Sequence, residues 1–155
     1  MPQYVDCYWL VRDRRSEITK AFLNKFLPER EESFGNYPVP MRSESPIKTF
    51  MNVNELIEYL QDSDEEYLIY WKNTNPRCIF KHGIAIYTDD KRLILGVSIE
   101  GNAPDEKDII ERYYTISNFL NAEISCITVE EVAPSNSVAF REFCKNRYVP
   151  EPRKN

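Results

Sequence analysis

The stretch CIFKHGIAIYTDDKRLILGVSIE, residues 78–100, decides the fold because apolar side chains recur in it at every second position. Such alternation is typical of β-strands that bury one face. An acidic pair, Asp89 and Asp90, separates the two alternating runs. The apolar rows are Cys78, Phe80, His82, Ile84 and Ile86 in the first run and Leu93, Leu95, Val97 and Ile99 in the second. The stretch therefore predicts an antiparallel hairpin of two long strands.

A two-residue turn at Asp89 and Asp90 would set a definite register for this hairpin. The predicted pairs are Ile86 with Leu93, Ile84 with Leu95, His82 with Val97, and Phe80 with Ile99. In this register both apolar rows lie on the same side of the sheet. Gly83 then lies opposite Gly96 on the reverse face, where a helix or another backbone could approach closely. Asp-Asp is a poorer turn than Asn-Gly, so a slightly longer loop is the alternative.

The segments around this hairpin predict three further strands and four helices. The strands are expected over residues 4–11, 67–72 and 124–130, and the helices over residues 16–26, 52–60, 104–120 and 135–145. The order β-α-loop-α-β-β-β-α-β-α predicts an α+β fold. We expect a single, mostly antiparallel or mixed sheet of about five strands, with helices packed mainly on one face. The pattern leaves open where the first and fifth strands lie in the sheet.

The length of 155 residues is typical of one domain, and we expect residues 1–148 to form it, with a frayed tail over residues 149–155. Residues 27–48 are expected to be an irregular loop within that domain. Four prolines interrupt this loop, while Phe34, Tyr37 and Met41 give it apolar side chains to pack on the surface. Loops of this length are commonly functional or mobile.

Composition and charge exclude several classes of protein. A hydrophobic content of 42% excludes a disordered chain, and a net charge of −5 argues against binding to the phosphate backbone of a nucleic acid. No window approaches the ~18 apolar residues that a membrane span requires, so no membrane partner is expected. The first residues lack the pattern of a signal peptide, and the 4 cysteines form no CxxC motif. We therefore expect a cytoplasmic protein.

The single histidine, His82, restricts the catalytic chemistry, because any Ser-His or Cys-His mechanism must use it. Cys78 would lie about 13 Å from it along a strand, too far for a hydrogen bond or a shared zinc ion. Since Phe80 and Ile84 share its predicted row, we expect His82 to be enclosed by apolar neighbours. The 4 glycines form neither a Walker loop nor a GxGxxG motif. We therefore expect no metal and no cofactor.

These observations favour a non-enzymatic, acidic module that binds a protein partner with a basic surface, most concretely an immunity-type inhibitor. Tyrosine and tryptophan provide large contact areas, and acidic patches steer basic partners. The predicted contact residues are Tyr37 in the loop, the acidic cluster Asp62, Asp64 and Glu65, and Tyr87 on the reverse face of the sheet. The alternative is a small hydrolase-like enzyme or a small-molecule-binding domain that uses His82 or a pair of carboxylates in a cleft. The oligomeric state is left open.

Overall fold

The computed structural model describes residues 3–152 and contains one large antiparallel sheet and one small one. The strands of the large sheet run in the order β2-β5-β6-β7-β1-β8, and β3 pairs with β4 in the small sheet. The strands are β1 (Tyr4–Val11), β2 (Arg30–Glu32), β3 (Tyr37–Val39), β4 (Lys48–Phe50), β5 (Tyr67–Asn73), β6 (Phe80–Tyr87), β7 (Leu93–Glu100) and β8 (Ile124–Val129). The first strand therefore lies inside the sheet, between β7 and β8.

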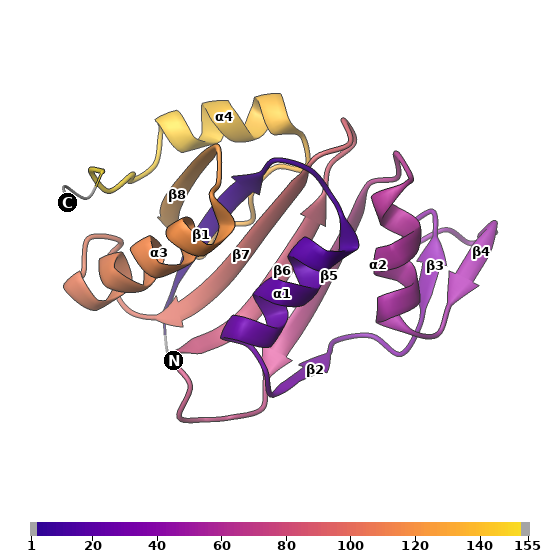
Figure 1. Ribbon diagram of the computed structural model, residues 1–155, viewed down its shortest axis with the longest axis horizontal. Helices are drawn as coiled ribbons and strands as arrows, with labels where there is room; N and C mark the ends of the chain where they lie inside the picture. Colours follow the sequence, from indigo (N-terminus) through magenta and orange to yellow (C-terminus); the bar gives the residue numbers. More distant parts are fainter. Residues whose placement is uncertain (1–2, 153–155) are drawn as a thin grey trace.

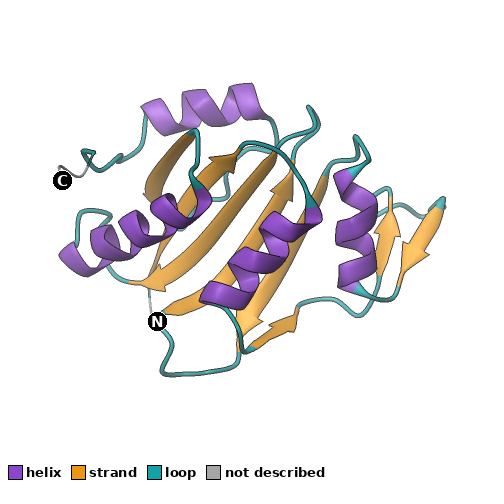
Figure 2. Cartoon of the chain, in the orientation of Figure 1, coloured by secondary structure: helices purple, strands orange, loops and turns teal. Residues whose placement is uncertain are grey.

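Four helices cover the two faces of the large sheet unequally. The helices are α1 (Ser16–Phe26), α2 (Val53–Gln61), α3 (Lys107–Leu120) and α4 (Ser137–Lys145). The first three pack on one face, whereas α4 crosses one end of the opposite face (Figures 1 and 2). This arrangement confirms the α+β fold with one main sheet and helices mainly on one face.

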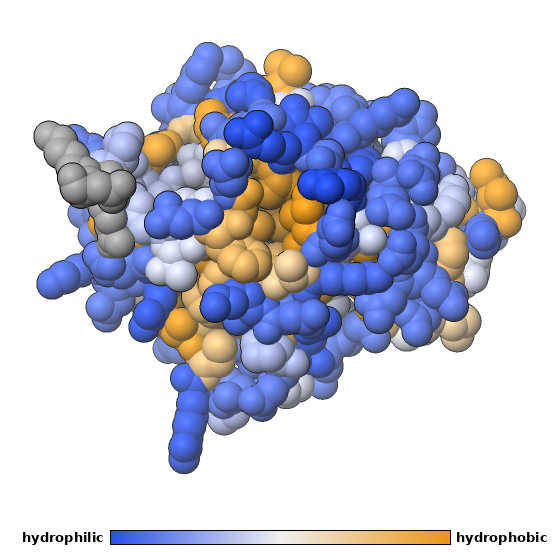
Figure 3. Space-filling view, in the orientation of Figure 1, coloured by the Kyte–Doolittle hydropathy of each residue, from blue (hydrophilic) through white to orange (hydrophobic). Residues whose placement is uncertain are grey.

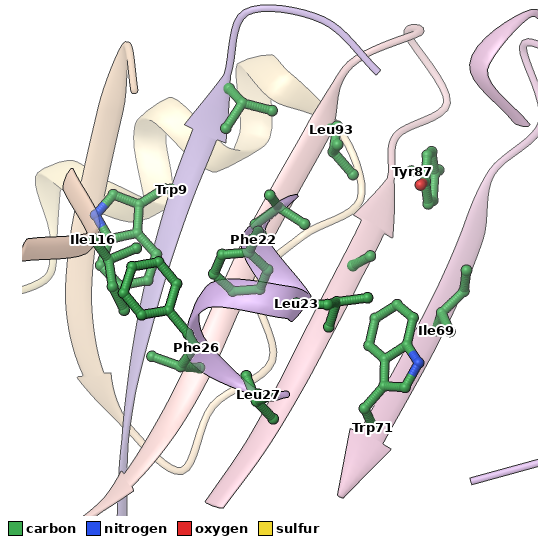
Figure 4. Close-up of a cluster of buried hydrophobic side chains, with 14 of the residues drawn as sticks. Trp9, Phe22, Leu23, Phe26, Leu27, Ile69, Trp71, Tyr87, Leu93 and Ile116 are labelled. Atoms are coloured by element: carbon green, nitrogen blue, oxygen red, sulfur yellow. The ribbon is translucent and has the colours of Figure 1, made fainter. Parts of the chain in front are cut away.

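The main core lies between the sheet and the helices α1, α2 and α3. Trp9, Ile69 and Trp71 project from the strands toward Phe22 and Leu23 of α1 (Figure 4). In both β1 and β5 the odd-numbered residues up to Trp71 face this core. Fully burying a large apolar side chain stabilises a fold by about 1.5–3 kcal/mol, so this layer supplies most of the driving force for folding.

A second, smaller core lies under α4 and uses the other face of the same strands. Phe140 and Cys144 of α4 pack against Leu10, Ile86 and Ile94. All three sheet residues lie toward one end of the sheet, where α4 crosses it (Figure 1). The other end of this face carries no helix, and the candidate site lies there.

The register of the β6–β7 hairpin differs by one residue from the predicted one. Loop 88–92 joins the strands, so Tyr87 pairs with Leu93 and His82 pairs with Ser98. The predicted two-residue turn is therefore wrong, and the longer loop weighed as its alternative is present. A bulge between Phe80 and His82 returns Phe80 to the main core, opposite Ile99.

Contacts with the start of α4 hold loop 88–92 in its longer form. The carboxylate of Asp90 accepts hydrogen bonds from the backbone N–H of Ser137 at 3.1 and 3.2 Å. The N–H of Asp89 donates to the carbonyl of Ser135 at 2.9 Å. Because these partners lie more than forty residues away in the sequence, the turn residues alone could not reveal the loop.

The change of register also separates the two glycines that were expected to lie opposite one another. Gly83 pairs with Val97 and faces α1, where a Cβ atom would lie 3.3 Å from a methyl carbon of Leu27. Gly96 pairs with Ile84 and faces the opposite side. The predicted smooth patch formed by both glycines is therefore wrong.

Residues 27–48 contain regular structure that the sequence pattern did not indicate. They include β2 and β3 and begin β4, each only three residues long, which is too short for alternation to be recognised. β2 extends the main sheet to six strands by pairing with β5, and β3 and β4 form the small sheet beside α2 (Figure 1). The expectation of an irregular loop is corrected to this extent.

Part of the C-terminal segment contacts the domain. Tyr148 forms an isolated bridge with Ile127 of β8, and the Tyr114 hydroxyl of α3 donates to the carbonyl of Glu151. Residues 153–155 of the predicted tail lie outside the described residues. Within residues 3–152, no helix has the length and apolar character needed to cross a lipid bilayer.

Candidate functional site

A row of polar side chains crosses the sheet on the half of its face that α4 leaves open. Thr128 of β8 lies opposite Asp6 of β1, Asp6 lies opposite Ser98 of β7, and Ser98 lies opposite His82 of β6. Lys72 of β5 continues the row beyond His82. Directly opposed residues on neighbouring strands project from the same face with Cβ atoms about 4.5–5.5 Å apart. The row therefore places an acid, a hydroxyl and an imidazole side by side.

Asp6, Ser98 and His82 of this row line the sheet-face pocket, which has a volume of about 380 Å³. It is bounded by Tyr4, Asp6, Tyr8, Tyr70, His82, Gly83, Ile84, Val97, Ser98, Glu130, Glu131 and Val132. Three tyrosines from two strands thus surround the polar row, and the segment after β8 forms one wall. This volume is in the range of sites that bind small ligands or single side chains.

Gly96 allows Tyr8 to lie against the sheet in this pocket. A Cβ atom at Gly96 would lie 2.7 Å from Cδ1 of the Tyr8 ring and 2.8 Å from Cγ2 of Ile84. The ring therefore occupies the space that any larger residue would fill. The Tyr8 hydroxyl donates a 2.6 Å hydrogen bond to the carbonyl of Glu131, which fixes the ring at its other end.

His82 lines this pocket and is not enclosed by apolar side chains, so that expectation is wrong. Its Nδ1 atom lies 2.7 Å from the Ser98 hydroxyl, and the Tyr4 ring packs edge-on against it with centroids 5.2 Å apart. The shifted register is the cause, because it places Ser98 opposite His82 where Val97 was expected. Burial, with a smaller contribution from Lys72, lowers the pKa of His82 below its usual value. The imidazole is therefore neutral at pH 7.

Asp6 is a mostly buried carboxylate of the pocket wall. Burial raises its pKa from 3.8 to about 6, and repulsion from Glu130 and Glu131 adds to the shift. Its Oδ2 atom accepts one hydrogen bond, 3.1 Å long, from the backbone N–H of Glu131. Among residues 3–152, no lysine, arginine or histidine forms an ion pair with Asp6. The site therefore carries an uncompensated negative charge whenever Asp6 is ionised.

The segment after β8 adds two more acids to the wall of the pocket. Glu131 forms an ion pair with Arg147, with the Nη2 and Oε2 atoms 2.5 Å apart, so its charge is compensated. Glu130 is exposed and forms no ion pair within the described part of the chain. Its backbone has a φ of 50°, a left-handed conformation that costs a non-glycine residue about 1–2 kcal/mol. Such local strain is common at binding sites.

Two of the predicted contact residues are buried. Tyr87 has no exposed surface because it faces the main core, where its hydroxyl lies 3.1 Å from that of Thr19. Tyr37 is 2% exposed, and its hydroxyl donates a 2.8 Å hydrogen bond to Glu32. The placement of Tyr87 on the reverse face is wrong, for the same reason of register. Neither tyrosine presents its side chain to a partner in this conformation.

The acidic cluster Asp62, Asp64 and Glu65 lies apart from the pocket. It lines a surface hollow together with Tyr59, Ser63 and Lys91. Arg14, which is 4% exposed, holds the backbone of this segment. Its Nη1 atom donates to the carbonyls of Leu60, Ser63 and Glu65 at 3.3, 3.0 and 3.1 Å. The cluster thus follows a helix end whose dipole Arg14 offsets, which explains why acids are tolerated there.

A further hollow lies on the helix-covered face, between α1 and α3. Figure 3 shows an apolar area in the middle of this face, surrounded by hydrophilic side chains. The hollow has a volume of about 500 Å³ and includes Ile18, Ala21 and Phe119. The acids on its rim are neutralised by Arg15, which pairs with Asp13 and Glu17. Unlike the sheet-face pocket, it presents no carboxylate without an ion-pair partner among the described residues.

Sequence reasoning missed most residues of the pocket. Asp6 and Ser98 are polar residues in otherwise apolar strands, and this signal could have singled them out. Tyr8 and Tyr70 share the open face by alternation, but the pattern did not show which strands are neighbours. Glu130 belongs to a turn with no recognisable motif. No group of three or more His, Cys, Asp or Glu side chains within residues 3–152 is arranged to hold a metal ion.

Comparisons of this chain with known protein families, with curated proteins and with solved structures found no match.

Proposed function

We propose that this protein is a non-enzymatic binding module that docks a protein partner with a basic surface, in the manner of an immunity-type inhibitor. The observation that carries the proposal is Asp6, a mostly buried carboxylate at the open face of the sheet that has no counter-ion within residues 3–152. An isolated buried charge is costly, and a cation supplied by a partner would compensate it. Partner binding would thus remove an unfavourable feature of the free protein.

The surroundings of Asp6 support a protein partner. Tyr4 and Tyr70 flank the acid on half-exposed positions of β1 and β5. Tyrosine is frequent among the residues that dominate binding energy, because it provides a large contact area with few rotatable bonds. The site is built on paired strands, so it is preorganised and the entropy lost on binding is small.

The overall charge supports the same proposal. A net charge of −5 attracts a basic partner over a distance and raises the association rate. All four cysteines are free thiols, which supports a reducing, cytoplasmic environment for the protein.

The test uses immobilised protein and a lysate of the native cells, with quantitative mass spectrometry of the retained proteins. We expect a basic protein to be retained stoichiometrically by the wild-type chain and lost by the double variant Asp6→Asn, Glu130→Gln. The matched control, Asp62→Asn with Asp64→Asn, removes the same charge from the acidic cluster and should retain the partner. Retention that does not depend on Asp6 and Glu130, or no stoichiometric partner, would contradict the proposal.

The contact between Ser98 and His82 favours a second candidate function, a small hydrolase-like enzyme. A neutral imidazole whose Nδ1 lies 2.7 Å from a hydroxyl can accept the proton of an attacking serine. Within residues 3–152, however, no carboxylate accepts a hydrogen bond from the other nitrogen of His82. Such a partner normally orients the base, and its absence makes the binding module the better supported function.

A fluorophosphonate probe separates the two functions, because it labels only an activated serine. On the proposal of a binding module, Ser98 stays unlabelled in the folded protein. Labelling in the wild type that disappears in Ser98→Ala and in His82→Gln would instead establish the hydrolase.

A further inference from the structure

We infer that the sheet-face pocket is a guanidinium site, and that it receives an arginine side chain of the partner. This inference rests on the proposed function, but it concerns the chemistry of the pocket and can be tested without the partner. It combines three observations: unmatched carboxylates, tyrosine rings, and the number of hydrogen-bond acceptors.

The first observation is that, among residues 3–152, no cationic side chain forms an ion pair with Asp6 or Glu130. Arg147 is committed to Glu131, and its guanidinium lies 4.3 Å from the centre of the Phe143 ring. Lys72 lies on the far side of His82 in the cross-strand row, and two strands, β6 and β7, separate it from Asp6. The pocket therefore favours a positive ligand and disfavours an anion such as phosphate.

The second observation is the aromatic lining. Tyr4, Tyr8 and Tyr70 contribute three rings to one pocket. Aromatic faces attract cations, and arginine makes this contact more often than lysine because its planar group stacks on a ring. Arg147 over Phe143 already shows this kind of contact within the molecule.

The third observation is the number and spread of acceptors. Asp6 comes from β1 and Glu130 from the turn after β8, so the two carboxylates approach the pocket from different elements. Ser98 and Tyr70, which each carry a hydroxyl group, belong to the same lining. A guanidinium has five N–H donors in a fixed plane and can serve several separate acceptors at once. An ammonium is a compact point charge with three donors, so it is less suited to acceptors that come from several separate elements.

The experiment titrates ethylguanidinium chloride into the full-length protein and follows the resonances of the pocket residues by NMR. We expect saturable shifts of the Tyr4, Tyr8, Tyr70 and His82 signals at millimolar concentrations. Butylammonium should bind about tenfold more weakly, and the uncharged isostere ethylurea should cause no saturable shift. Equal binding of butylammonium, or shifts with ethylurea, would overturn the assignment of a guanidinium site.

Variants locate the bound group. Asp6→Asn should weaken ethylguanidinium binding about tenfold, as should the separate variant Glu130→Gln, whose exposed position leaves folding intact. The control Asp62→Asn with Asp64→Asn should bind as the wild type does. Binding that is unchanged in both Asp6→Asn and Glu130→Gln would overturn the inference.

This experiment and the capture of the partner fail in distinguishable ways. If ethylguanidinium does not bind although retention of the partner depends on Asp6, the guanidinium inference is wrong and the proposed function stands. If ethylguanidinium binds in the pocket but no partner is retained, the proposed function is wrong and the pocket chemistry stands.

Discussion

The charge of Asp6 has opposite effects on folding and on binding. Its carboxylate is mostly buried, accepts one backbone hydrogen bond and faces Glu130 and Glu131. Tyr4, Tyr8, Tyr70 and His82 lie in the same pocket, and Arg147 balances only Glu131. A charge held in this way destabilises the free protein and strengthens the attraction for a cation.

The first prediction is that Asp6→Asn stabilises the protein at pH 7 but not at pH 4. The pKa of Asp6 is about 6 in the folded protein and 3.8 in the unfolded chain, so the folded state binds the proton more tightly. The contribution of Asp6 to stability therefore falls as the pH rises from about 4 to 6 and stays constant above. At pH 7 we expect the free energy of unfolding of Asp6→Asn to exceed that of the wild type by about 1–2 kcal/mol. This figure allows for solvent screening of the Asp6 carboxylate, which is partly exposed. Urea unfolding of both proteins at several pH values measures it.

The difference in unfolding free energy between the wild type and Asp6→Asn reports on Asp6 alone, because the other groups that titrate in this pH range are the same in both proteins. His82 contributes with the opposite sign, because its lowered pKa makes stability fall as the pH falls, and this contribution is present in both proteins. A difference in unfolding free energy that is the same at pH 4 and pH 7 would contradict the prediction.

The second prediction is that Gly96→Ala disturbs the pocket as well as the fold. The added methyl would collide with the Tyr8 ring and with Ile84, at 2.7 and 2.8 Å. We expect a loss of about 1–3 kcal/mol in the free energy of unfolding, as for other overpacked sites. The Tyr8 resonances should shift, and ethylguanidinium binding should weaken.

Gly35→Ala is the matched control for this substitution. No atom lies within 4 Å of a Cβ at Gly35, and its φ is not positive, so stability should change by less than about 0.5 kcal/mol. Equal stability of the two variants would show that Tyr8 can move without cost.

At the scale of elements, Arg14 joins three segments that are distant in the sequence. It follows β1 and donates from Nη1 to one carbonyl at the end of α2 and to two in the segment after it. Its Nη2 atom donates to the carbonyls of Thr88 and Arg92 at 2.6 and 3.2 Å. The guanidinium also lies 5.4 Å from the centre of the Tyr87 ring. One buried cation thus fixes both the acidic cluster and loop 88–92.

The third prediction is that Arg14→Met destabilises the protein by about 2–4 kcal/mol, because it leaves several buried carbonyls without a donor. Chemical denaturation measures the loss, and amide exchange should increase in loop 88–92 and after α2. The control is Arg15→Met. Its side chain is 64% exposed and forms only surface ion pairs, so the change should stay below about 1 kcal/mol. Equal effects of the two substitutions would show that the buried network contributes nothing.

Elements with a strong local pattern could be predicted from the sequence. α1 begins at Ser16 as expected, and α2 is capped by Asn52, whose side chain accepts from the N–H groups of Asn54 and Glu55. The strands predicted over residues 4–11 and 67–72 are present as β1 and β5. In each case neighbouring residues carry all the information, since periodicity and capping are local properties.

The hairpin register could not be predicted, because Arg14 and the start of α4 hold loop 88–92 from distant parts of the chain. A shift of one residue exchanges the two faces of a strand, so it also misplaced His82 and Tyr87. The candidate site was missed for the same reason. Its row of Asp6, Ser98 and His82 exists only once β1, β7 and β6 are known to be neighbours in the correct register.

At the scale of the whole molecule, the net charge of −5 acts together with the pocket. The fourth prediction is that added salt slows association with the basic partner more than it speeds dissociation. Long-range attraction is screened beyond a Debye length of about 10 Å at 0.1 M salt, whereas contacts inside the pocket are partly shielded from ions. Surface plasmon resonance at several salt concentrations measures both rates. An association rate that does not change with salt would contradict the prediction.

α4 covers only one end of its face of the sheet, so the strands that build the pocket have two different faces there. One face packs in the main core, and the other is open to solvent. Tyr4, Asp6, Tyr70 and His82 can be exchanged without touching the layer of Trp9, Phe22 and Trp71. Related proteins could therefore bind different partners after substitutions at a few positions on the open face, while the core side of the same strands keeps the fold unchanged.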